Sequence, residues 1–145
     1  QSNATGTLRT GLAWPYAMGY HFTPLVNGSV VALGGFFNGT KLVKLFDKAS
    51  GALLASTTVT AANTWGYAPI APAAVKAGTT YTVAVYLAGS GGSYRWGFTA
   101  LPRTLKDIRI EGSTYVSTSS NASARPTNTF PTIMYGQADI GFLSD

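Results

Sequence analysis

The stretch AVYLAGSGGSYRWGF, residues 84–98, holds two runs of alternating side chains separated by a turn of Gly and Ser. Alternation with a period of two is typical of a half-buried β-strand, and such turn residues are typical of a hairpin. With a four-residue turn, Val85 would face Trp96 across the two strands. The stretch therefore predicts an antiparallel β-hairpin whose aromatic residues Tyr94, Trp96 and Phe98 are buried in a core.

The same register predicts an outer pair, in which Tyr86 lies opposite Arg95 within reach of a cation–π contact. A turn one residue longer or shorter would reverse every face, and the aromatic rings would then stand in solvent as a ligand platform. Burial of three rings stabilises a fold by several kcal/mol at roughly 25 cal/mol per Å². That gain favours the core interpretation over the platform.

Period-two alternation recurs along the chain, and helical patterns are nearly absent. Asn38-Gly39 predicts a hairpin turn, and residues 47–51 predict another. Residues 113–116 fit a further short strand, and residues 117–129 predict a long loop that is ordered only where something holds it. We expect strands at residues 16–23, 29–37, 41–47, 53–60, 65–70, 80–88, 93–99, 106–111 and 139–143.

Many short strands in 145 residues, with no second domain, predict an all-β fold. The expected architecture is a two-sheet antiparallel β-sandwich, jelly-roll-like. Residues 1–4 look like the remnant of a protease site added for expression, so the domain is expected to span residues 5–145.

Composition narrows the setting of the protein. Charged residues make up 10% of the chain, against about 25% in an average soluble domain, and cysteine is absent. Such a polar, uncharged surface favours an extracellular protein, and thiol chemistry is excluded. The net charge of +5 comes from scattered Lys and Arg, so we expect no nucleic-acid partner, and no apolar run approaches the length of a membrane span.

Five segments in order resemble a bacterial domain-of-unknown-function family found in secreted multidomain proteins. They are GYHFTP at 19–24, GSVVAL at 28–33, SGALLAS at 50–56, AGTTY at 77–81, and Tyr135 followed by DIGF at 139–142. The resemblance implies a jelly-roll-like sandwich on a secreted or surface protein, beside immunoglobulin-like or carbohydrate-active modules. It implies no activity and no catalytic residues, and Lys41 stands where family members often carry a His.

The motif residues also have a structural interpretation. Gly78 suits a turn that leads into the following strand. The large apolar residues of the motifs are expected in the core. These are Phe22, Leu33, Leu54, Tyr81 and Phe142.

Residues that could carry catalysis are sparse. His21 is the only histidine, and alternation turns it away from its two neighbours, which predicts a surface side chain. No GxSxG motif occurs, and Asp107, Arg109 and Glu111 fit a solvated ladder better than a glycosidase pair. Asp47 or Asp139 could join a calcium site, but no Asp-rich loop is present. We therefore expect no enzyme, no cofactor and no metal.

Aromatic residues outside the expected core remain as candidates for ligand binding. Rings stack on the apolar face of a sugar while polar side chains bind its hydroxyl groups. The candidates are Trp14, Trp65, Tyr67, Tyr86 and Arg95. The sequence thus favours a non-catalytic extracellular or cell-surface module, a carbohydrate-binding or adhesion domain of a larger secreted bacterial protein. The expected partners are a glycan and neighbouring domains of the same polypeptide. The alternative is a purely structural spacer or interaction domain.

Overall fold

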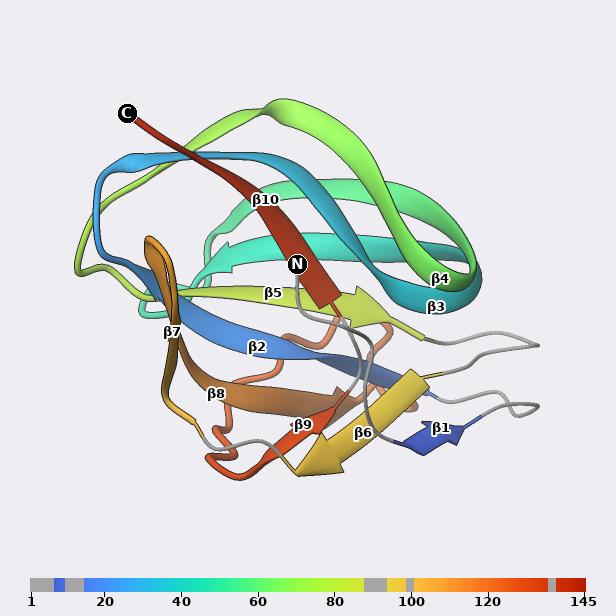
Figure 1. Cartoon of the computed structure of the whole chain (residues 1–145). Coiled ribbons are helices and arrows are strands. Elements are labelled where there is room, and N and C mark those ends of the chain that lie inside the picture. Colours follow the sequence, from blue (N-terminus) through green and yellow to red (C-terminus); the bar gives the residue numbers. More distant parts are fainter. Residues whose placement is uncertain (1–6, 10–14, 88–93, 99–100, 136–137) are drawn as a thin grey trace.

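The fold is built from antiparallel strands, and no helix occurs among the described residues (Figure 1). The computed structural model describes residues 7–9, 15–87, 94–98, 101–135 and 138–145, with the backbone alone at 7–9, 94–98 and 135. The strands are β1 (Thr7–Arg9), β2 (Tyr16–Pro24), β3 (Gly28–Asp47), β4 (Leu53–Val75), β5 (Tyr81–Tyr86), β6 (Tyr94–Phe98), β7 (Arg103–Leu105), β8 (Ile108–Ser117), β9 (Ile133–Tyr135) and β10 (Ala138–Ser144). The all-β class predicted from alternation is confirmed.

The described strands divide unequally over two sheets. The larger sheet has the order β10-β3-β5-β2-β8-β7, with β4 paired to β3, and the smaller has the order β1-β6-β9. The first part of β3 pairs with β10 and its last part pairs with β5, while β4 follows both parts. The long β3–β4 ribbon therefore curls across the molecule, as Figure 1 shows.

The turn predicted at Asn38-Gly39 is wrong. Both residues lie inside β3, where the register with β4 shifts after Phe37 and Gly39 adopts a φ of 96°. Such a β-bulge bends a strand without reversing it. Residues 29–37 and 41–47 thus belong to one strand, and residues 53–60 and 65–70 likewise join in β4.

The predicted hairpin of the 84–98 stretch is also wrong. β5 pairs with β2 along one edge and β3 along the other, so no edge remains for β6. β6 pairs instead with β1 and β9 in the smaller sheet. The turn at 89–92 and the side chains of Tyr94, Trp96 and Phe98 lie outside the described residues.

The predicted turn at residues 47–51 is confirmed. The backbone N–H of Gly51 donates to the carbonyl of Asp47, and the Asp47 carboxylate accepts from both the backbone and the hydroxyl of Ser50. Gly51 has a φ of 75° and Gly78 a φ of 79°, values that glycine adopts without strain.

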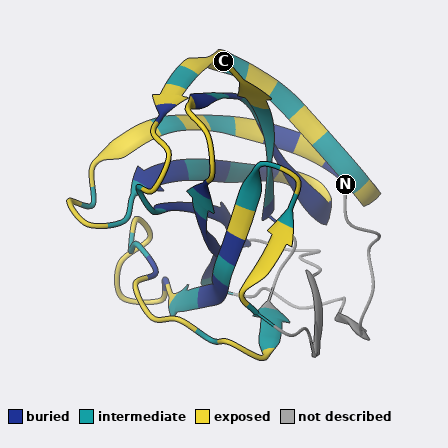
Figure 2. Ribbon diagram, turned by 60° about the vertical axis from the view of Figure 1, so that its left-hand side comes forward, coloured by how far each residue is buried: buried dark blue, intermediate teal, exposed yellow. Residues whose placement is uncertain are grey.

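The core lies on one side of the central strands and contains Phe22, Leu33 and Tyr81, as predicted. Every residue of β5 is buried, whereas much of β4 is exposed. Figure 2 colours the ribbon by burial, with buried residues dark blue and exposed residues yellow. Phe142 is half-buried against the core. Leu54 is 39% exposed near the start of β4, so its assignment to the core is wrong.

The irregular segment 118–129 covers the opposite face of the central strands. Its Asn128 carbonyl accepts a hydrogen bond from His21 Nε2 at 2.9 Å, and its Ala124 carbonyl accepts from the Tyr86 hydroxyl at 2.9 Å. Arg125 donates to the carbonyl of Lys48 at 3.1 Å. His21 is fully buried as a result, so the prediction of a surface histidine is wrong.

Candidate functional site

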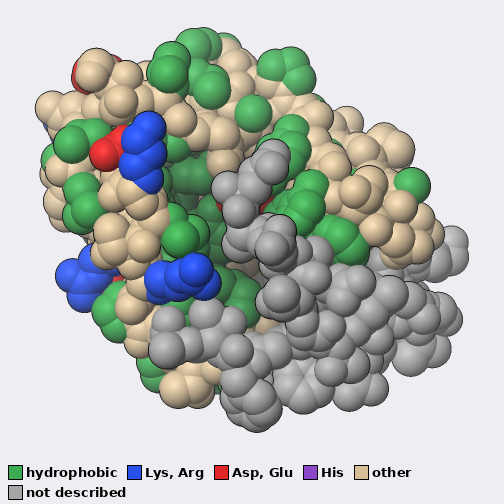
Figure 3. All heavy atoms as spheres, in the orientation of Figure 1, with side chains coloured by type: hydrophobic (Ala, Val, Ile, Leu, Met, Phe, Trp, Pro, Cys, Tyr) green, Lys and Arg blue, Asp and Glu red, His purple; other side chains and the backbone are tan. Residues whose placement is uncertain are grey.

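A cavity of about 510 Å³ lies between β10 and the β7–β8 hairpin. Hydrophobic side chains line a hollow on this face of the molecule, coloured green in Figure 3. Ile110 of β8 and Met134 of β9 contribute apolar wall, and the aromatic residues Trp65 and Tyr67 of β4 contribute another part. Strands from distant parts of the sequence, including β4, the β7–β8 hairpin and β10, thus meet at one concave site.

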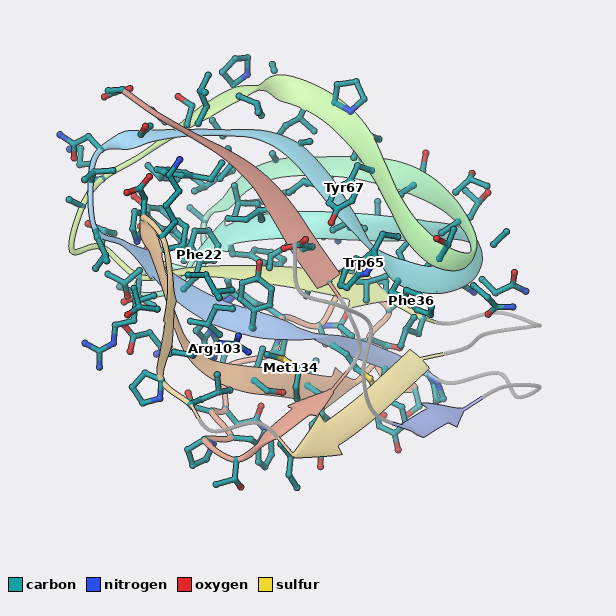
Figure 4. All side chains as sticks on the ribbon, in the orientation of Figure 1. Phe22, Phe36, Trp65, Tyr67, Arg103 and Met134 are labelled. Atoms are coloured by element: carbon teal, nitrogen blue, oxygen red, sulfur yellow. The ribbon has the colours of Figure 1, made fainter. Side chains whose placement is uncertain are left out.

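The aromatic wall follows from the pleat of β4. Trp65 and Tyr67 are two residues apart, so their side chains leave the same face of the strand. Their rings stack with centroids 6.4 Å apart and an interplanar angle of 17°. Phe36, opposite Trp65 on β3, adds an edge-on contact at 5.8 Å. Figure 4 shows the three rings together beside β10.

Asp139 is the polar centre of the site. The Tyr20 hydroxyl donates to its Oδ1 at 3.0 Å, and the Tyr67 hydroxyl donates to its Oδ2 at 2.5 Å. Burial raises the pKa of both tyrosines well above the usual range, and the Asp139 carboxylate raises each further. Both phenols therefore remain protonated and keep their hydrogens directed at Asp139.

Gly34 makes this arrangement possible. It lies on β3 opposite Asp139 on one side and Tyr67 on the other, so the two partners flank it in register. A Cβ at position 34 would overlap the Tyr67 ring and the carbonyl of Gly66. The missing side chain lets the Tyr67 ring cross over β3 and reach the edge strand.

The rim of the cavity carries an ion pair. Lys106 and Asp107 form the two-residue connection between β7 and β8, where Lys106 has a φ of 55°. Lys106 Nζ lies 3.9 Å from Asp107 Oδ2, and the lysine side chain is 90% exposed. So exposed a pair contributes little to stability. The expected ladder along β8 is present only as a contact of 3.4 Å between Arg109 and Glu111.

The structure brings two of the sequence-predicted ligand residues together and separates a third from them. Trp65 and Tyr67 line the cavity, whereas Tyr86 is buried on the opposite face, with Lys44 Nζ 4.6 Å from its ring centroid. The predicted pairing of Tyr86 with Arg95 is wrong, because Arg95 lies in β6 opposite Leu8. The Arg95 side chain and all of Trp14 lie outside the described residues.

Sequence reasoning missed the roles of Tyr20 and Asp139 at this site. Alternation on β2 places Tyr20 with Phe22 on the core face, which is correct but does not show where the hydroxyl ends. Asp139 stands out in the sequence as one of only five acidic residues. Its partners come from positions 72 and 119 residues away, so no local signal connects them.

A second, more open cavity of about 770 Å³ lies beside His21. Threonines, Lys48 and Glu111 line it. The two ring nitrogens of His21 are engaged by Thr82 Oγ1 at 2.7 Å and the Asn128 carbonyl, so the ring is a structural link in this arrangement. Within the described part of the chain, no three His, Asp or Glu side chains gather in a way that could hold a metal ion.

These features define an antiparallel all-β domain with an aromatic, carboxylate-bearing cavity. The chain belongs to a family described as a domain of unknown function, DUF4082, which it matches over residues 3–139. This match confirms the family type that the motif order predicts. No curated protein matches the chain significantly. No helix in the described residues has the length and apolar character needed to cross a membrane.

Proposed function

We propose that the chain is a non-catalytic carbohydrate-binding module of a larger secreted bacterial protein, and that the cavity between β10 and the β7–β8 hairpin holds the sugar. The observation that carries this proposal is the stacked pair Trp65–Tyr67 beside the Asp139 carboxylate. An aromatic face covers the C–H face of a pyranose, while carboxylate and phenol oxygens accept hydrogen bonds from its hydroxyl groups.

The size of the cavity supports this proposal. Small-molecule sites commonly enclose about 300–1,000 Å³, and the cavity of about 510 Å³ falls within that range. Its wall is largely apolar, with a few polar groups gathered at Asp139, which is the usual composition of such sites.

The composition supports the extracellular or cell-surface location within the proposal. A chain with 10% charged residues and no cysteine relies on Ser, Thr, Asn and Gly for its solubility. We further propose that the curled large sheet and the small sheet together form a jelly-roll-like sandwich. The core between the β3–β4 ribbon and strands β2 and β5 supports that architecture.

Affinity electrophoresis in gels containing a panel of polysaccharides tests the binding function. The wild-type protein should be retarded by at least one of them, and Tyr67→Ala should weaken that binding at least about tenfold, equivalent to about 1.4 kcal/mol. Tyr67→Phe keeps the ring and should keep most of the binding. Tyr86→Phe, which alters a residue outside the cavity, is the matched control and should bind as the wild type does.

The second candidate function is a structural or interaction domain. Among the described strands β4 pairs only with β3, and Leu53 and Leu54 are 53% and 39% exposed at its start. An unpaired strand edge can bind another strand. If no polysaccharide retards the folded wild-type protein at high concentration, this second function is favoured, and sedimentation would then report any self-association.

A further inference from the structure

We infer that the site at Asp139 selects glycans that present hydroxyl or ammonium donors and rejects glycans that carry anionic groups. This inference rests on the proposed carbohydrate-binding function and names the ligand class of the same cavity. It follows from the direction of the hydrogen bonds around Asp139.

Tyr20, Tyr67 and Asp139, the three side chains hydrogen-bonded to one another at the centre of the site, offer a ligand acceptors only. The Trp65 indole N–H and the Ser144 hydroxyl are donors elsewhere in the lining. Tyr20 and Tyr67 each have one hydroxyl hydrogen, and both hydrogens point to Asp139. The high pKa of both phenols keeps those hydrogens in place, so neither tyrosine releases its donor. A carboxylate has about four lone-pair positions, of which the tyrosines occupy two. The remaining positions on Asp139 and the phenol oxygens can only accept.

The charge of the site acts in the same direction. Among the described residues that line the cavity, Asp107 and Asp139 are acidic and Lys106 is the sole base. Lys106 is directed to solvent with 90% exposure and is already beside Asp107. No basic side chain in the described part of the chain forms an ion pair with Asp139, although Arg103 of β7 lies on the same face of the molecule (Figure 4). A like charge brought against Asp139 is repelled, whereas an ammonium group gains a charge-assisted hydrogen bond.

The geometry shows which edge of a bound sugar must carry the hydrogen-bond donor. Asp139 Oδ2 accepts the hydrogen bond from the Tyr67 hydroxyl, and the Tyr67 ring stacks on Trp65. A sugar lying on this aromatic wall therefore directs one edge toward Asp139. The substituent on that edge has to be a hydroxyl or an amino group.

Two matched series of oligosaccharides test the inference by titration calorimetry with the wild-type protein. One series has a β-1,4-linked gluco backbone, and its neutral, amino and uronate members are cello-oligosaccharide, chitosan oligosaccharide and oligoglucuronate. The other has a galacto backbone as galacto-oligosaccharide, oligogalactosamine and oligogalacturonate. In the series that binds, the neutral or amino member should bind at least about tenfold tighter than the uronate, measured with the amino groups protonated.

Asp139→Asn should weaken binding of the amino sugar at least about tenfold. The variant should also show a smaller difference in affinity between the amino sugar and the uronate. Glu111→Gln is the matched control, because it removes one negative charge from a residue outside this lining, and binding should stay as in the wild type. If the wild-type protein binds the uronate as tightly as the neutral sugar, the inferred rejection of anionic glycans is wrong, but the proposed function stands. Failure of every sugar and polysaccharide to bind overturns the function itself. The uronate comparison needs no variant, so it stands even if Asp139→Asn does not fold.

Discussion

Gly34 shows how one residue without a side chain can set a binding site. It separates Asp139 and Tyr67 in the strand register, and the Tyr67 ring crosses the space that a Cβ would fill. The same space is bounded by the Gly66 carbonyl, which belongs to the backbone and cannot rotate away. The site therefore depends on glycine for access rather than for a special φ angle.

Gly34→Ala should lower the free energy of unfolding by about 1–3 kcal/mol, because overpacking displaces the ring or the strand. Urea denaturation measures this loss, and oligosaccharide binding should weaken with it. Gly141→Ala on the neighbouring strand is the control, since its Cβ would lie 3.1 Å from the Ala32 Cβ and needs a smaller adjustment. Equal losses in the two variants would contradict the role assigned to Gly34.

The candidate site was predictable from the sequence only in part, because alternation selects residues on one strand but does not show which strands lie next to each other. Trp65 and Tyr67 could be selected because they share a strand face and stand outside the expected core. Asp139 could not be joined to them, because its contacts depend on the register of three strands around Gly34. His21 was misplaced because alternation reports which side of a strand a residue takes, not what covers that side.

At the scale of elements, the positions of most strands were predictable and their partners were not. The alternation in YTVAVY marks β5 correctly, but an alternating pattern does not show that β2 and β3 occupy both of its edges. Asn38-Gly39 has the chemistry of a hairpin turn, yet Gly39 serves a bulge inside β3. A positive φ is needed in both structures, so the local signal is the same.

The segment 118–129 is the element whose order depends on single side chains. Asn128 Oδ1 accepts a hydrogen bond from the Thr114 hydroxyl at 3.0 Å and lies 3.4 Å from the backbone nitrogen of Tyr115. Thr114 is fully buried, so its hydroxyl has little access to water when this partner is lost. The Asn128 amide thus binds the segment to β8 beside the backbone bridge between Ser113 and Phe130, which follows directly after the segment.

Asn128→Ala should lower the free energy of unfolding by about 1–3 kcal/mol, the usual cost of a buried group left without its partner. Backbone amides in the segment should also exchange with solvent faster, which hydrogen-exchange mass spectrometry can localise. Ser123→Ala is the control, because that exposed residue is bonded only through its backbone N–H to Asn121. Unchanged exchange in Asn128→Ala would mean that other contacts hold the segment.

At the scale of the whole molecule, the central strands are covered on both faces. The core occupies one face, and the segment 118–129 lies on the other, where it binds the His21 ring and the Tyr86 hydroxyl. Central strands of an antiparallel sheet often leave one face to solvent. Here the burial of both faces shifts the ionisation of the groups enclosed between them.

The alkaline limit of stability should depend on the buried tyrosines. Burial raises the pKa of Tyr86 to about 12, whereas the unfolded chain ionises tyrosine near pH 10. The contribution of Tyr86 to the free energy of unfolding is therefore complete below about pH 10. It declines as the pH rises toward the pKa of Tyr86 in the folded protein. In Tyr86→Phe, the free energy of unfolding should fall less steeply with rising pH over that window, as measured by denaturant titration. Tyrosinate absorbance should show Tyr86 ionising late in the folded wild-type protein.

The acid limit of stability should depend on His21, the only histidine in the chain. Burial lowers the pKa of His21, and the positive charges of Lys48 and Arg125 lower it further, while the hydrogen bond to the Asn128 carbonyl opposes them. Glu111 is the acidic residue that shares the cavity beside the ring. Because the unfolded histidine takes up a proton near pH 6.5 and the folded one does so only at lower pH, stability is complete above about pH 6.5.

Below about pH 6.5 the free energy of unfolding should therefore fall by at most about 1.4 kcal/mol per pH unit, the slope of a single proton. Carboxylates titrate mainly below about pH 5, so the window between these values isolates His21. His21→Gln keeps a polar side chain between Thr82 and Asn128 but does not titrate, and its stability should be flat across the window. Urea denaturation at several pH values measures both slopes. An equal slope in the variant would place the acid sensitivity outside the segment that covers β2 and β5.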